Sequence, residues 1–323
     1  MMNRRDAARW MVAATSWAVT ATTFAQADKS LRWIVPYPAG GGSDFLARLI
    51  SQELTKQTKR TVIIENKPGG NTAIAAQEVA RSAPDGNTIL SADNGTMVFN
   101  SALYSKLSYN PDKDLTPVTL MGVFPMILVV GASSSIKTVK DFIDQAKAKP
   151  GQISYGSAGA GSPHHLAMEL LKVNAGLDMV HVPYRGAAPA LTDVAGGQIP
   201  AMMVDLAAGA GFLQGGKVRA LAVANAKRLA RLPDVPTFDE LGFKGVEAAA
   251  QVGIVAPAAT SPEVVSALQK QVAAAIHEPD IHQKLIDFGI EPVGSTPKEY
   301  ADLIHAEVQR WHKLIRDQKI SLD

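Results

Sequence analysis

The sequence predicts an α/β fold of two lobes, each a mostly parallel sheet flanked by helices, with a ligand cleft between the lobes. Three observations support this. Strand-like and helical segments alternate along the chain, and the alternation restarts after Gly131. Three glycine-rich segments each stand between a strand and a helix, as they do at ligand sites of open α/β sheets. The 323 residues suit about two domains.

The first unit begins with a strand over 31–37 and a helix whose apolar residues share one face. A β-branched strand over 61–66, a helix over 72–82 and a strand over 88–92 follow. This βαβαβ order indicates parallel strands with helices on both faces of the sheet. The residues of the shared helical face are Phe45, Leu46, Leu49, Ile50 and Leu54.

An uncharged run from Leu115 to Ile136 is long enough to suggest a membrane helix. Pro117 and Pro125 interrupt it, and its apolar core, "MILVV", has the length of a strand. We therefore predict a buried strand with flanking loops.

The second unit repeats the alternation of strands and helices. Pro163 at the first turn and Gly176 past the end mark one helix clearly. The predicted helices lie at 138–148, 162–176 and 187–197, and the predicted strands at 152–157, 179–184, 201–206 and 218–224.

The chain closes with a strand over 252–258 and two long helices. Ser261 and Thr296 are their predicted caps, each followed by a proline at the first helical position. The second unit thus interrupts the first. We predict lobe 1 from residues 28–127 plus 250–323 and lobe 2 from the inserted residues 128–249.

The three glycine-rich loops are "PYPAGGGSD", "NKPGGNT" and "YGSAGAGSPHH", which precede helices expected to open at Ser43, near Asn71 and at Ser162. A helix start exposes free N–H groups and a partial positive charge. Glycines let a ligand approach the backbone, so these loops suit an anion such as a carboxylate. Each cluster could also serve only as a tight turn.

Several other functions are excluded or disfavoured by the sequence. The chain has no cysteine, which excludes disulfides and thiolate chemistry. No G-x-G-x-x-G occurs in these loops, and the P-loop spacing that begins at Gly211 has Val218 where magnesium binding needs Ser or Thr. The histidines lack metal-ligand spacing. We therefore predict no cofactor and no metal.

The first 27 residues resemble a secretory signal. Arg4 and Arg5 precede an uncharged stretch that ends in Ala25-Gln26-Ala27, a small-x-small cleavage pattern. A twin-arginine signal is the alternative. Removal of residues 1–27 takes away three arginines and one aspartate, so the formal charge falls from +2 to 0. The mature chain therefore lacks the net positive charge that is typical of nucleic-acid-binding proteins.

The ordered motifs "PYPAGGGSD", "VIIENKPGG", "APDGNTIL", "YGSAGAGSPHHLAMEL", "VPYRGAAPALTDVAGGQI" and "RLPDVPTFDELG" carry a resemblance. The chain resembles the Bug family, the periplasmic solute-binding receptors of tripartite tricarboxylate transporters, over about Leu31 to Asp323. The resemblance implies a periplasmic-binding-protein fold that closes over a small carboxylate, membrane transporter subunits as partners, a periplasmic location and no enzymatic activity. We also expect a monomer.

The resemblance, carried over by motif, assigns ligand-binding residues in both lobes. Topology adds Asn94, in the loop "DNGT" after the third strand. The full set is Tyr37, Ala39, Gly40, Gly41, Asp44, Gly70, Asn94, Ser157, Gly159, Gly161, Ser162, His164, Tyr184, Arg185, Gly186 and Asp205, with Asn71 as a further candidate.

Some roles stay open at this point. Asp44 either interacts with the start of its own helix or receives an amine or bridging water of the ligand. Arg185 either pairs with a carboxylate or holds the Tyr184 loop. A chemosensory receptor would use the same site. A hydrolase with Ser157 or Ser162 as nucleophile is disfavoured because neither serine stands in G-x-S-x-G.

Overall fold

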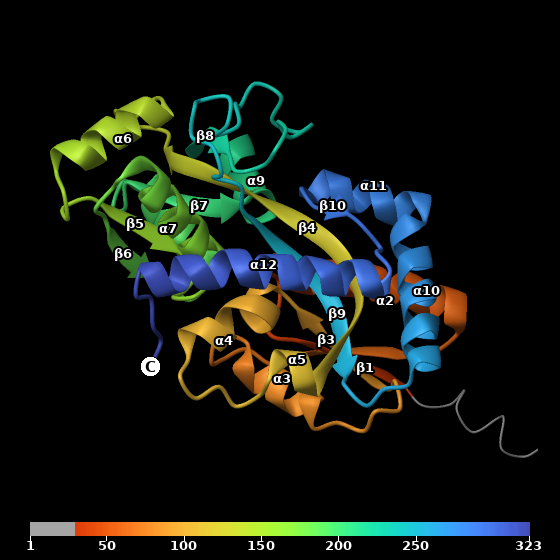
Figure 1. The fold of residues 1–323 in the computed structure, drawn as a ribbon. Coiled ribbons are helices and arrows are strands. Elements are labelled where there is room, and N and C mark those ends of the chain that lie inside the picture. Colours follow the sequence, from red (N-terminus) through yellow and green to blue (C-terminus); the bar gives the residue numbers. More distant parts are fainter. Residues whose placement is uncertain (1–29) are drawn as a thin grey trace, which may run out of the picture.

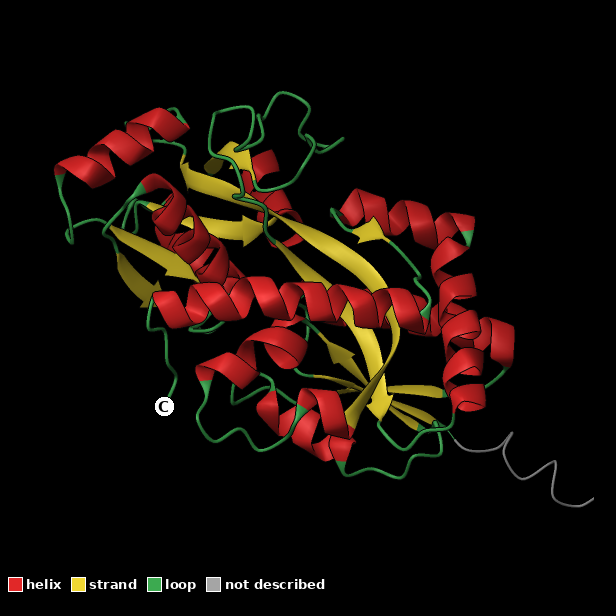
Figure 2. Ribbon diagram, in the orientation of Figure 1, coloured by secondary structure: helices red, strands yellow, loops and turns green. Residues whose placement is uncertain are grey.

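The computed structural model describes residues 30–323, and the predicted signal peptide, residues 1–27, lies outside them. The strands form one mixed sheet in the order β2-β1-β3-β9-β4-β7-β5-β6, with β8 and β10 also paired to β4. Helices flank this sheet (Figure 1; Figure 2). The predicted α/β class with flanking helices is confirmed, but the sheet is mixed rather than mostly parallel, because β9 and β4 pair with their neighbours in the antiparallel sense.

The predicted parallel strands of the first unit are confirmed. They are β1 (Leu31–Val35), β2 (Val62–Asn66) and β3 (Thr88–Ala92), and β1 pairs in parallel with both β2 and β3. The strand β9 (Ala249–Pro257) lies beside β3 and pairs with it in the antiparallel sense.

Two hydrophobic clusters bury the two faces of these strands. One contains apolar residues of α2 (Gly42–Thr58), α10 (Pro262–His277) and α11 (Pro279–Phe288). The other contains residues of α3 (Ala73–Ala80) and α12 (Pro297–Asp317). Helices therefore cover both faces, as the βαβαβ order indicates. The helix α11 and the short strand β10 (Glu291–Pro292) were not predicted.

The uncharged run forms a longer strand than predicted. The strand β4 (Leu115–Gly131) includes both prolines, so the prediction of a loop before "MILVV" is wrong. Register shifts follow Pro117, and Pro125 ends the pairing with β9. The prolines thus stand next to irregularities of the ladder, where a missing N–H is tolerated.

The second unit contains β5 (Ser154–Ser157), β6 (Val180–Pro183), β7 (Ala201–Asp205) and β8 (Val218–Val223). Its predicted helices are α6 (Val139–Ala148), α7 (Pro163–Ala175) and α8 (Ala187–Ala195). The helix α9 (Leu206–Gln214) was not predicted, because Gly209 and Gly211 lower its helix propensity.

The strand β4 joins the two units. It pairs with β9 up to Pro125 and with β7 from Met126 onward. In this ladder Ala92, at the end of β3, aligns through Gly253 with Leu120, and Asp205 aligns with Met126. The ends of β3 and β7 therefore point toward each other, six β4 residues or roughly 20 Å apart.

Three short helical segments follow β3: η1 (Gly95–Phe99), a π-helix, α4 (Asn100–Leu103) and α5 (Pro111–Asp114). The expected loop at 93–96 is therefore wrong, since the π-helix begins at Gly95. Single π turns of this kind are rare in proteins overall, and those that do occur are often found at functional sites.

Between Ser30 and Asp323, no helix combines the length and the apolar character that crossing a bilayer requires.

Candidate functional site

The first glycine-rich loop leaves its helix start without a side-chain cap. The helix α2 begins at Gly42 with Gly41 as its N-cap, so the expectation that Ser43 opens the helix is wrong by one residue. Ser43 lies in the first turn, and its buried hydroxyl has no partner in the described chain. The N–H groups of Gly41 and Gly42 likewise have none. This start therefore offers unused donors.

Asp44 holds this loop in place. Its buried carboxylate accepts from Gly40 N at 2.9 Å, Arg48 Nε at 2.9 Å and Asn66 Nδ2 at 2.9 Å. Burial alone would raise the pKa of the Asp44 carboxyl, but these bonds bring it below its usual value. Of the two open roles, this geometry favours the interaction with its own helix start.

The second loop has an unusual backbone. Gly69 and Gly70 are followed by Asn71 and Thr72, all with positive φ, at 46° and 75° for the two non-glycine residues. Left-handed geometry at a β-branched residue costs free energy and persists only where the surroundings enforce it. The N–H groups of Gly70 and Asn71 have no partner among residues 30–323.

A buried polar network enforces this backbone. Asn100 Nδ2 donates to Asn71 O at 2.7 Å, and Asn71 Nδ2 donates to Asn100 Oδ1 at 2.8 Å. Thr96 Oγ1 bonds Thr72 Oγ1 at 2.8 Å and Asp93 Oδ1 at 3.1 Å. The π-helix η1 carries Thr96 and leads directly into Asn100, so it positions the loop.

Two predicted residues belong to the same region. Tyr37 donates its hydroxyl to Asp93. Asn94 is almost fully buried, and its Oδ1 accepts from Gln251 N at 2.6 Å. Both side chains therefore fix the ends of strands rather than project freely. Asn100 was not predicted, and within the predicted loop "DNGT" only Asn94, not Asp93, was assigned to the ligand; the polar residues of the stretch "DNGTMVFN" were the available signal.

Most backbone N–H groups of the third loop donate to acceptors within the loop itself or in the first turn of α7. Gly159 N donates to Ser157 Oγ at 3.1 Å, and Gly161 N donates to His165 Nδ1 at 3.1 Å. Ser162 caps α7, as predicted, by accepting from His165 N. Donors without a partner in the described chain are the N–H groups of Ala160 and His164.

Two stacked imidazoles support the third loop from inside. The rings of His165 and His181 lie 3.8 Å apart and nearly parallel, and His181 Nε2 bonds Ser157 Oγ at 2.7 Å. Burial lowers the pKa of His165 to about 4, with help from the charge of Lys172. Burial and the neighbouring His165 lower the pKa of His181 to about 3. Both rings are therefore neutral in the folded protein near pH 7.

We expect acid to destabilise the protein through this pair. The unfolded chain protonates histidine near pH 6.5, whereas folded His165 resists protonation until about pH 4. Stability is thus complete above about pH 7 and falls as the pH drops from 6.5 to 4, by roughly 3 kcal/mol for His165. His181, whose pKa is lowered further, adds to this loss. Urea unfolding at successive pH values measures this. His165→Asn, which keeps an acceptor for Gly161 but does not titrate, should make the curve shallower, while His181 still contributes; an unchanged slope would contradict the assignment.

His164 and Asp205 form a buried pair next to this loop. His164 Nε2 lies 2.9 Å from Asp205 Oδ2, while Asp205 Oδ1 accepts from Ala208 N and caps α9. His164 Nδ1 is buried and has no partner in the part of the chain that the structure describes.

The loop after β6 contributes a free cation. Tyr184 bonds Asp193 at 2.6 Å, and Gly186 N, at φ 112°, donates to Ala158 O. These contacts hold the loop without Arg185, which is exposed and has no ion pair within residues 30–323. Of the two roles open for Arg185, holding the Tyr184 loop is not observed.

The two units touch on both sides of this region. Asn71 Nδ2 donates to Gly161 O at 3.4 Å. A Cβ at Gly161 would lie 2.7 Å from Asn71 Nδ2 and 2.8 Å from Leu103 and Leu322 side-chain atoms. On the other side, a Cβ at Gly289 would lie 2.9 Å from Leu206. The predicted site residues of both units thus belong to facing strand-end loops.

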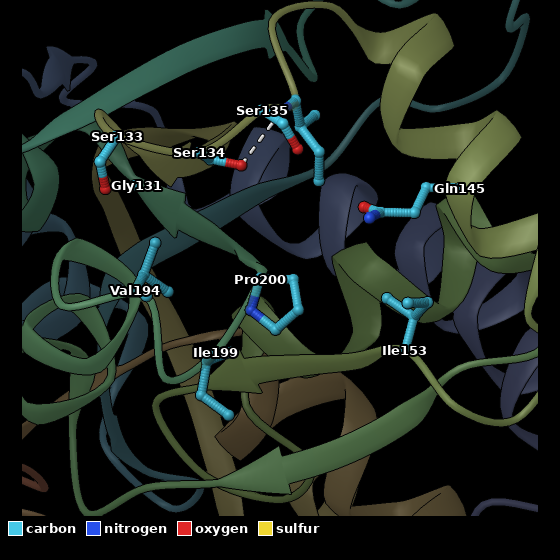
Figure 3. Close-up of a pocket in the computed structure, with 11 residues that line it drawn as sticks. Gly131, Ser133, Ser134, Ser135, Gln145, Ile153, Val194, Ile199 and Pro200 are labelled. Carbon is cyan, nitrogen blue, oxygen red and sulfur yellow. Dashed lines mark hydrogen bonds between the residues drawn. The ribbon is translucent and has the colours of Figure 1, made fainter.

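A cavity of about 260 Å³ lies elsewhere, at the outer end of β4 (Figure 3). Serine hydroxyls, Gln145 and apolar side chains line it, and no charged side chain does. The nearby helix α6 has a complete capping box, which uses the N–H groups of Thr138 and Asp141. This cavity lacks what an anion needs. Among the described residues, no group of three acidic or histidine side chains could hold a metal.

Comparison with known proteins places this chain among receptors. The family model of the tripartite tricarboxylate transporter family receptor matches residues 46–320. The UPF0065 protein in the tcbD-tcbE intergenic region of Pseudomonas sp. (strain P51) is 35% identical over 91% of this chain and 88% of its own. Protein BugT of Bordetella pertussis is 30% identical over 90% of this chain and 89% of its own.

Solved structures agree in fold. R. palustris Rpa4515 with adipate has a TM-score of 0.85 and 35% identity, covering 89% of this chain and 96% of its own. MatC (Rpa3494) from Rhodopseudomonas palustris with bound malate has a TM-score of 0.82 and 32% identity, covering 89% and 99%.

Proposed function

Because this chain belongs to the tripartite tricarboxylate transporter receptor family, which includes the Bug proteins, we propose that it is a periplasmic receptor for a small organic carboxylate. It binds the solute between its two lobes by lobe closure and delivers it to the membrane subunits of a transporter. The proposed lobes are residues 28–127 plus 250–323 and residues 128–249, and residues 1–27 direct export. The protein acts as a monomer and carries out no reaction.

One observation carries the proposal: backbone donors from both units, without partners in the described part of the chain, lie in facing loops across the middle of β4. They belong to the starts of α2 and α3 in lobe 1 and of α7 in lobe 2. Such groups favour negative charge and suit carboxylate oxygens. The adipate and malate named for two similar structures support a carboxylate as the ligand.

The proposed ligand contacts are of two kinds. Backbone groups of Gly41, Gly70, Asn71 and His164 bind the carboxylate directly, and the exposed Arg185 attracts it. The remaining predicted residues shape the loops, since Asp44, Tyr37, Asn94 and Asp205 are occupied by internal bonds. A chemosensory receptor would use the same contacts.

A thermal-shift screen of the mature chain against mono- and dicarboxylates, aromatic acids and acidic amino acids tests the proposal. An acid at 100 times its dissociation constant should stabilise the protein by about 2.7 kcal/mol. Neutral sugars serve as the control set. Stabilisation by sugars alone, with no response to any acid, would refute the carboxylate assignment.

Gly41→Val should block the first loop without harming the fold. Gly41 has φ −81°, which valine tolerates. Apart from its chain neighbours, the one described residue that a Cβ there would approach within 4 Å is Pro38, through its carbonyl oxygen at 3.7 Å. The added side chain would stand where a ligand approaches the backbone. We expect the melting temperature of the free protein to stay within about 2 °C and carboxylate affinity to fall at least about tenfold, by calorimetry. Unchanged affinity would show that this loop is not a contact.

A further inference from the structure

We propose that His164 recognises a hydroxyl group of the ligand, so that the preferred solute is a hydroxycarboxylate rather than the corresponding unsubstituted acid. This inference rests on the proposed carboxylate-receptor function and refines it.

The bond to Asp205 selects the tautomer of the neutral His164 ring. An ionised carboxylate only accepts hydrogen bonds, so Nε2, at 2.9 Å from Asp205 Oδ2, must carry a proton. In the neutral ring the other nitrogen, Nδ1, then presents a lone pair. The second oxygen of Asp205 binds Ala208 N at 2.8 Å, which holds the carboxylate in place. His164 therefore offers an oriented acceptor.

This acceptor is buried without a partner. His164 is 9% exposed, and within residues 30–323 no donor bonds Nδ1. An unpaired buried acceptor is costly, equivalent to roughly five- to a hundredfold in an equilibrium constant. A ligand that donates a hydrogen bond to Nδ1 recovers this cost, and a ligand of the same shape without a donor does not.

The position of His164 fits a ligand contact. It stands on the first turn of α7, between the contact of Gly161 with Asn71 and the contact of Leu206 with Gly289. Its own backbone N–H is among the free donors assigned to the carboxylate. A hydroxyl close to the carboxyl group of the ligand could therefore reach the ring of the same residue.

A hydroxyl suits this location better than an ammonium group. The starts of α7 and α9 both carry partial positive charge beside the ring, which disfavours a cationic ligand group. The oxygens of Asp205 are already bound to His164 and Ala208. A neutral donor meets neither difficulty.

Calorimetric titration with matched acids tests the inference: malate against succinate, lactate against propionate and 3-hydroxybutyrate against butyrate. The variants are His164→Gln and Thr260→Ala. Glutamine retains an N–H that can reach Asp205 but has no atom at the position of Nδ1. Thr260 is also buried, and its hydroxyl has no partner among residues 30–323; it lies outside the facing loops, before α10, and serves as control.

With the wild type and Thr260→Ala, we expect the hydroxy member of the best-bound pair to bind at least about tenfold more tightly. With His164→Gln the ratio should fall below about twofold. Equal binding of both members by the wild type, or a ratio that survives in His164→Gln, would overturn the inference while leaving the receptor function intact. If no acid of any pair binds, the proposed function fails with it. If His164→Gln does not fold, the wild-type ratio alone decides.

Discussion

Gly161→Ala should weaken carboxylate binding about ten- to a hundredfold. Gly161 lies where lobe 2 meets Asn71, Leu103 and Leu322, and its new Cβ would lie within 2.8 Å of an atom of each. No real contact of this kind is so short, so these side-chain ends would have to shift, and the bonds of Asn71 Nδ2 to Asn100 and Gly161 would be disturbed. Overpacking of this degree costs about 1–3 kcal/mol. Because the proposed ligand binds between the lobes at this contact, the cost would reduce the free energy of carboxylate binding.

Gly176→Ala is the matched control. Gly176 flanks the other end of the same helix, α7, and has a similar left-handed φ, 63° against 74°. Apart from its chain neighbours, no atom of residues 30–323 lies within 4 Å of its Cβ position. Both substitutions therefore carry the same backbone strain, about 1–2 kcal/mol, but only Gly161→Ala strikes the opposite lobe. Calorimetry on both variants measures the difference. Equal affinity in the two would contradict the role of this contact.

Asn100→Ala should cost both stability and affinity. The fully buried Asn100 carboxamide binds Asn71 through both its oxygen and its nitrogen. Its loss leaves those groups unpaired, at about 1–3 kcal/mol each. It also removes what holds Asn71 and Thr72 at positive φ. Urea unfolding should show a loss of about 2–4 kcal/mol, and the affinity for any bound carboxylate should fall.

Two variants separate the effects of this substitution. Ser101→Ala, at the exposed neighbouring position, should change neither quantity. Asn100→Asp keeps the acceptor for Asn71 Nδ2 but loses the donor to Asn71 O, so we expect an affinity near that of Asn100→Ala. An Asn100→Ala protein with wild-type affinity would show that the strained loop does not contact the ligand.

The fold was largely predictable because it rests on local patterns. The β-branched run of β2, the proline and glycine around α7 and the caps of α10 and α12 all follow from neighbouring residues. The full length of β4 could not be predicted from neighbouring residues, because its prolines are tolerated only through register shifts against β9. The helix α9 is poor in helix formers, and its start depends on the Asp205 cap.

The site was predictable as a set of loops but not as a set of roles. Glycine-rich sequence located the three helix starts. It could not show that Gly40 N is used by Asp44, or Gly161 N by His165, because these bonds depend on side-chain placement. The network of Asn100 and Thr96 joins residues 24 to 29 positions apart, which no local pattern reveals.

The most direct test of this account is a crystal structure of residues 28–323 with the acid that stabilises the protein most. We predict the carboxylate between the starts of α2 and α3 on one side and α7 on the other, bound by N–H groups of Gly41, Gly70 and His164. A carboxylate bound instead in the cavity at the outer end of β4, or only at the surface, would contradict the account.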